Sequence, residues 1–279
     1  MIKKKILYLY EKNLKSGNGH YTRSKNYYEY LKNFFNIDFT NFKNFQYYNK
    51  KNSFDFYIFD LKNYNLDFFK KNKLFNKSLT FDNFKNFSSR INISIFDHNP
   101  KIRGTRLKGL KYIYINSKKF KKLKKNKHFK KKLFISVGSK DINRFIPKII
   151  KKLKKEKIKC QTKVYLPNSK LKKENQKKFL QDFITSDYCI VNGGMTMVES
   201  IFLKKKCIIL PQTKDEKKFT QYLKKKKIIS YIGLTSIKKL KNDLNDQKKM
   251  IVAKYNLNFD NRGHYRLNKI LNNILTKKN

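Results

Sequence analysis

The chain has 279 residues and a formal net charge of +50, with 69 Lys and Arg against 19 Asp and Glu. Its 39% hydrophobic residues suffice for the cores of two ordinary domains, and no apolar run approaches the roughly 20 residues that span a bilayer. The sequence has no zinc-finger spacing, no RNA-binding strand signature and no basic zipper, which excludes the commonest nucleic-acid-binding modules.

The lysine runs are spread along the chain rather than gathered on one motif, as at 3–5, 130–132 and 224–227. Ala occurs once, and Lys, Asn, Ile, Phe and Tyr predominate, as A- and T-rich codons would produce. We therefore interpret the basic surface as codon bias and predict no specific nucleic-acid partner, only weak, salt-sensitive adhesion to polyanions. Peripheral contact with a membrane and the oligomeric state are left open.

In the first half of the chain, strand-like and helix-like segments alternate. Short apolar runs predict strands, and apolar residues at helical spacing predict helices. The expected elements are strands at 5–10, 54–60, 79–82 and 91–96, and a helix at 20–33. The apolar stretch at 5–10 is too short for a signal peptide. The lysine-rich residues 117–132 predict a linker between an N-terminal domain at 1–116 and a C-terminal domain at 133–279.

The second half alternates in the same way. Strands are expected at 133–138, 162–166, 188–191 and 207–211, and helices at 142–154, 179–185, 219–226 and 264–276, with a further helix after the strand at 188–191. Alternation in both halves predicts the α/β class, with two Rossmann-like parallel-sheet domains facing a cleft. The three cysteines lack metal-ligand spacing, which predicts reduced thiols, a cytoplasmic location and no metal.

Two glycine clusters each follow a predicted strand and precede a predicted helix. The first contains Gly17 and Gly19, and the second contains Gly193 and Gly194. Glycine lets a ligand come close to the backbone, and a helix N-terminus offers free N–H groups that suit a phosphate. The sequence therefore predicts a phosphorylated or nucleotide ligand at these loops.

The first cluster opens a segment, residues 17–23, that resembles the G-x-G-H-x-x-R loop of UDP-sugar hydrolases in pseudaminic acid biosynthesis. These enzymes belong to the nucleotide-sugar glycosyltransferase superfamily with two Rossmann-like domains. Further segments resemble other motifs of that family in the same order, at 94–100, 109–115, 134–141, 193–199 and 260–266. The resemblance implies a glycosyltransferase-B-like fold. It also implies hydrolysis of a UDP-linked amino or deoxy sugar in surface-polysaccharide or nonulosonic acid biosynthesis, with no cofactor.

Two departures from the family pattern concern the nucleotide-binding half. Ser139 stands where the family has the second glycine of its S-x-G-G segment. Residues 214–217 stand where the family has Asn-Gln or His-Gln, so Asp215 and Glu216 replace that polar pair. These departures predict an altered substrate or a weakened enzyme.

His20 is the expected catalytic residue, because an imidazole can accept a proton from water as a general base. Arg23 lies on the same helical face, where it could reach an anionic substrate group, orient the loop or form a surface salt bridge. The resemblance implies a substrate site whose further members are Gly17, Gly19, Gly138, Ser139, Gly193, Gly194, Met195 and Thr196, with the ribose on Glu199.

Three functions remain open on the sequence. The first is a UDP-sugar hydrolase, the second a glycosyltransferase that uses a UDP-sugar donor, and the third a degenerate nucleotide-sugar-binding protein. Asp60 and Asp97 end predicted strands, where a carboxylate can be functional or cap a helix.

Overall fold

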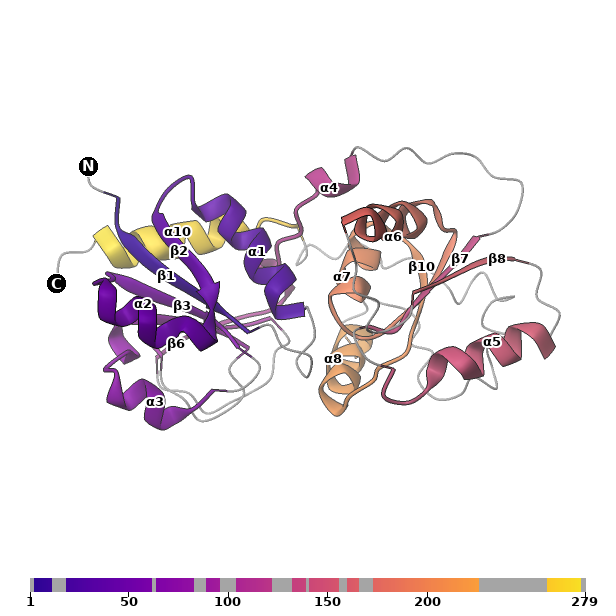
Figure 1. Cartoon of the computed structure of the whole chain (residues 1–279), viewed down its shortest axis with the longest axis horizontal. Coiled ribbons are helices and arrows are strands. Elements are labelled where there is room, and N and C mark those ends of the chain that lie inside the picture. Colours follow the sequence, from indigo (N-terminus) through magenta and orange to yellow (C-terminus); the bar gives the residue numbers. More distant parts are fainter. Residues whose placement is uncertain are drawn as a thin grey trace. The chain divides into compact units, whose positions relative to one another are not determined.

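The computed structural model describes residues 3–11, 19–61, 64–82, 89–95, 104–121, 132–138, 141–155, 160–165, 173–225 and 260–276. The chain divides into two compact units (Figure 1). The first combines Met1–Ile115 with Leu257–Asn279, and the second is Asn116–Asn256.

The first unit contains a parallel sheet in which the strands follow the order β2-β1-β3-β4-β5-β6. Their bounds are β1 Lys5–Tyr10, β2 Asn36–Asn41, β3 Phe56–Asp60, β4 Ser78–Phe81, β5 Ile91–Ser94 and β6 Thr105–Lys108. The sequence predicted β1, β3, β4 and β5 but not β2 or β6. Both missed strands lie at the edges of the sheet and bury fewer of their side chains. Their polar composition therefore gave no strand signal.

Helices cover both faces of this sheet. They are α1 Gly19–Leu31, α2 Phe45–Lys51, α3 Leu66–Lys71 and the C-terminal α10 Gly263–Thr276. On β3, Tyr57 and Phe59 pack into an aromatic core with Phe45 of α2 and Phe69 of α3. Because side chains alternate along a strand, the side chain of Asp60 lies on the opposite face, that of α1.

The C-terminal helix α10 belongs to the first unit, whereas the sequence-based division put residues 133–279 in one domain. The side chain of Asn261 bonds the backbone of Ile115, accepting from its N–H at 2.7 Å and donating to its carbonyl at 2.9 Å. Arg266 pairs with Asp260 at 2.5 Å and donates to the carbonyl of Lys111. The bonds of Asn261 to Ile115 and of Arg266 to Lys111 join residues about 150 positions apart, so no local sequence pattern reveals them.

Gly263 sets the close approach of α10 to the first unit. A Cβ atom there would lie 2.5 Å from the Ile113 carbonyl oxygen and 2.6 Å from the backbone of Tyr112. We expect Gly263→Ala to lower the free energy of unfolding by about 1–3 kcal/mol, the usual cost of overpacking. Chemical denaturation measures this cost, with Asn273→Ala on the exposed side of the same helix as the control. Equal stability of the two variants would contradict the packing role.

The second unit contains a parallel sheet with the order β10-β9-β7-β8. Its strands are β7 Lys132–Ser136, β8 Gln161–Tyr165, β9 Tyr188–Val191 and β10 Lys206–Ile209, and its helices are α4 Lys118–Lys121, α5 Phe145–Lys155, α6 Lys173–Thr185, α7 Met195–Phe202 and α8 Lys214–Lys225. Buried Ile146, Ile149 and Leu153 of α5 pack on the strands. The strands and helices predicted for 133–226 are thereby confirmed, with shifted ends.

The segment predicted as a linker, residues 117–132, begins with the short helix α4. Phe120 of α4 is buried, and its ring centroid lies 6.4 Å from that of Phe202 in α7.

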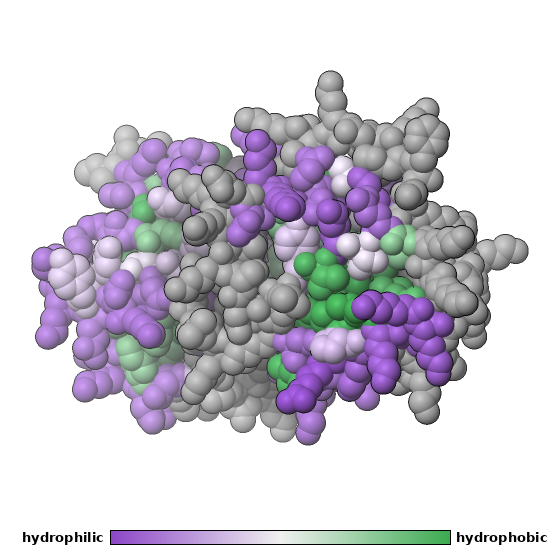
Figure 2. All heavy atoms as spheres, turned by 45° about the vertical axis from the view of Figure 1, so that its right-hand side comes forward, coloured by the Kyte–Doolittle hydropathy of each residue, from purple (hydrophilic) through white to green (hydrophobic). Residues whose placement is uncertain are grey.

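Hydrophilic side chains, coloured purple, cover much of the described surface in Figure 2. Among the described helices, none is long and apolar enough to cross a membrane.

Candidate functional site

One candidate site, in the first unit, lies at the carboxyl end of the first sheet. β1 pairs with β2 on one side and with β3 on the other, so the strand order reverses beside β1. In open parallel sheets, ligands bind outside the carboxyl ends of the strands at such a reversal. Asp60 is the last residue of β3, Asp82 follows β4, and the first turn of α1 carries His20.

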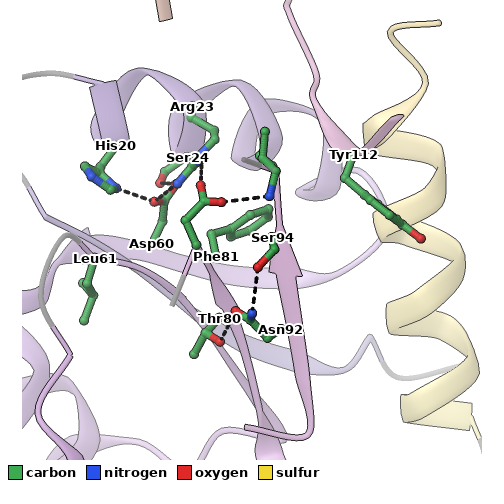
Figure 3. Close-up of polar contacts among 12 residues, drawn as sticks. His20, Arg23, Ser24, Asp60, Leu61, Thr80, Phe81, Asn92, Ser94 and Tyr112 are labelled. Atoms are coloured by element: carbon green, nitrogen blue, oxygen red, sulfur yellow. Dashed lines mark hydrogen bonds and ion pairs between the residues drawn. The ribbon is translucent and has the colours of Figure 1, made fainter. Parts of the chain in front are cut away.

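His20 and Asp60 form a hydrogen-bonded pair (Figure 3). The Nδ1 atom of His20 lies 2.7 Å from Oδ1 of Asp60. The side chain of Asp60 is fully buried, whereas 20% of the His20 side chain is exposed. A buried carboxylate thus holds a partly exposed imidazole, the arrangement that orients a catalytic histidine.

Arg23 anchors the same carboxylate from the next turn of α1. Its guanidinium donates to Asp60 through Nε at 2.8 Å and Nη2 at 2.5 Å, and through Nη1 to Asp82. The Ser24 hydroxyl donates to Asp60 at 3.0 Å, and the N–H of Ile95 donates to Asp82 at 2.8 Å. Arg23 is only 3% exposed, so this geometry favours orientation of the site over a surface salt bridge.

These contacts fix the protonation pattern of the pair. Burial alone would raise the pKa of Asp60, but Arg23 and His20 more than offset burial and hold that pKa well below its usual value. An ionised carboxylate only accepts hydrogen bonds, so Nδ1 of His20 carries the proton. In the neutral imidazole, Nε2 is then the basic nitrogen. His20 is therefore arranged to accept a proton through Nε2.

A separate candidate site, in the second unit, is the glycine loop, residues 192–194, which joins β9 to α7. This loop lies at the carboxyl end of the second sheet, where β7 pairs with β8 on one side and β9 on the other. Gly138, which follows β7, has φ +90°, and a Cβ atom there would lie 2.9 Å from Nδ2 of Asn192. A Cβ atom on Gly194 would lie equally close to that nitrogen. Glycine at both positions leaves room for the Asn192 side chain.

The helix after the glycine loop offers its N-terminus without a side-chain cap. Gly194, the N-cap residue of α7, has no side chain that could bond the first N–H groups of the helix. Met195 and Thr196 are the first two residues of the helix. A helix start of this kind presents backbone N–H groups to an anion. Glu199, one turn further on, is 7% exposed. Its predicted contact with a ribose stays a prediction, as do the predicted ligand contacts of the loop.

The structure also adds residues that the sequence analysis did not name as members of the site. Asp60, Asp82 and Ser24 contact one another or the His20–Arg23 pair. Asp60 was singled out at a predicted strand end, whereas Asp82, which ends the predicted strand at 79–82, was not. Gly19 begins α1. The predicted site members Gly17 and Ser139 lie outside the described residues, as does Asp97. Within the described ranges, no group of three His, Cys, Asp or Glu side chains could hold a metal ion.

The sequence matches no protein-family model and no curated protein. The structure is similar to the 2.2 Å crystal structure of a candidate UDP-N-acetylglucosamine 2-epimerase from Listeria monocytogenes, with a TM-score of 0.50 and 8% sequence identity. The similarity covers 99% of this chain and 98% of that one. At this identity the likeness bears on the fold alone. The chain has an α/β fold of two parallel-sheet units, of the glycosyltransferase-B-like kind predicted from the sequence.

Proposed function

We propose that this chain hydrolyses a UDP-linked sugar and releases UDP, with His20 as the general base. The observation that carries the proposal is the 2.7 Å bond between Nδ1 of His20 and the buried Asp60, at a strand-order reversal. A similar fold in a protein described as acting on UDP-N-acetylglucosamine supports the nucleotide sugar as substrate. The resemblance of residues 17–23 to the hydrolase loop supports water as the acceptor.

In the proposed reaction, Nε2 of His20 takes a proton from water as the water oxygen attacks the anomeric carbon. The bond from that carbon to the diphosphate oxygen breaks, and UDP leaves with the electron pair. Asp60 stabilises the imidazolium that forms, while Arg23 keeps Asp60 in place. Backbone N–H groups at the start of α7 would stabilise the charge that grows on the departing diphosphate.

Incubation with a panel of UDP-sugars, following UDP release with and without sugar acceptors, tests the proposed function. Release without an acceptor is the expected result, with a UDP-linked amino or deoxy sugar as the first candidate substrate. Release that requires an acceptor would instead establish a glycosyltransferase. Binding of UDP-sugars with no release under any condition would establish the degenerate binding protein.

The proposal assigns the UDP moiety to the glycine loop of the second unit. We expect Gly194→Val to weaken UDP binding at least about tenfold, because its side chain would displace Asn192 and obstruct the start of α7. Calorimetric titration with UDP measures this loss, and Asn175→Val, at an exposed position of α6 in the same unit, is the control. Unchanged UDP affinity in a folded Gly194→Val protein would remove the loop from the site.

A further inference from the structure

Glu216 brings a carboxylate against the glycine loop of the second unit. It lies in the first turn of α8, and its Oε1 accepts from Nδ2 of Asn192 at 2.6 Å. Its Oε2 accepts from the N–H of Gly193 at 3.3 Å and from the N–H of Gln212 at 2.6 Å. A Cβ atom on Gly193 would lie 2.9 Å from Cβ of Glu216, so only glycine permits this approach.

These contacts engage donors that the loop could otherwise offer to an anion. A backbone N–H has one hydrogen to donate, and that of Gly193 is directed at Glu216. The amide of Asn192, which lies against Gly138 and Gly194, is directed there too. Burial raises the pKa of Glu216, although the bonds from Gln212, Asn192 and Gly193 oppose that rise. The carboxylate therefore occupies a position suited to a negatively charged oxygen.

We propose that Glu216 is an internal anion that competes with the ligand's phosphate for the donors of the glycine loop. The inference rests on the proposed function, in which this loop receives the diphosphate of a UDP-sugar. A phosphate oxygen bonds the N–H of Gly193 and the amide of Asn192 only after the carboxylate has been displaced or neutralised. The competition lowers the affinity for UDP and so favours release of this product after the sugar has been cleaved.

Calorimetric titration of three proteins with UDP and with uridine tests the competition. Glu216→Gln removes the charge, while its amide oxygen can still accept from the loop. We expect this variant to bind UDP at least about tenfold more tightly than the wild type, since like charges brought together in a site are costly. Uridine affinity should stay the same. Asp215→Asn, an equal change of charge on the preceding exposed residue, should alter UDP affinity less than about twofold.

The outcomes separate the inference from the proposed function. UDP binding that is equally tight in wild type and Glu216→Gln would overturn the competition and leave the nucleotide site intact. If Glu216→Gln binds uridine but gains nothing from the diphosphate, the loop is not the phosphate site, and both proposals fail. Should Glu216→Gln fail to fold by circular dichroism, Glu216→Ala takes its place in the same titrations. UDP affinity at least about tenfold above that of the wild type supports the competition, and a smaller gain overturns it.

Discussion

Replacement of His20 by Asn is expected to lower the rate of UDP release from the true substrate by about 10²–10⁴, the usual contribution of a positioned general base. Asn keeps much of the size and hydrogen bonding of His near the first turn of α1, but it cannot accept a proton from water. UDP affinity should barely change, because the proposal places UDP on the glycine loop of the second unit.

Steady-state rates and UDP titrations on the same preparations measure both effects. Lys25→Ala, an exposed position on the same helix, is the matched control and should keep the wild-type rate. If His20→Asn releases UDP as fast as the wild type, His20 is not the base. Residues 17–23 would then shape the substrate site or serve only as a structural turn.

Replacement of Asp60 by Asn should impair both turnover and stability. An Asn amide can donate to Nδ1 of His20, which would move the imidazole proton to Nε2 and remove the basic nitrogen. We expect the rate of UDP release to fall by about 10²–10⁴. The variant also removes the ion pair between Asp60 and the buried guanidinium of Arg23, which keeps its contact with Asp82. Breaking a buried ion pair in this way costs about 3–5 kcal/mol of stability.

The stability loss should depend on pH. The pKa of Asp60 is lowered in the folded protein. Its contribution to stability is thus fully present above the unfolded Asp pKa of about 3.9 and is lost as the pH falls further. Urea denaturation at pH 7 should therefore separate the wild type from Asp60→Asn more widely than denaturation at pH 3.

Asp55→Asn is the matched control for Asp60→Asn. Asp55 is exposed and directly precedes β3, the strand that Asp60 ends. It accepts from the N–H of Lys5 at 2.8 Å, a bond that an Asn oxygen can also accept. We expect this variant to change stability by less than about 0.5 kcal/mol. A loss of stability as large as that of Asp60→Asn would show that the buried contacts of Asp60 with Arg23 stabilise the protein no more than the exposed contacts of Asp55 do.

The sequence by itself determined the central strands and the turn that precedes α7. Strands β1, β3, β7 and β9 are buried on both faces, so each is a short apolar run that local pattern reveals. Glycines at sharp strand-to-helix turns likewise leave a local signal. His20 stood out because the glycines just before it in the sequence predicted such a turn.

Only the tertiary structure decided which side chains meet. Asp60 lies 40 positions from His20, and Glu216 lies 23 positions from Gly193, yet each pair is within hydrogen-bond distance. The sequence offered Asp60 as a functional residue or a helix cap and treated Glu216 as a departure from a family pattern. Asn261, just before the terminal helix α10, and Arg266, within it, bond residues of the first unit about 150 positions away. Such contacts depend on the order of strands in the sheet and on the packing of helices against it, and these arrangements follow from burial over the whole unit rather than from any one segment.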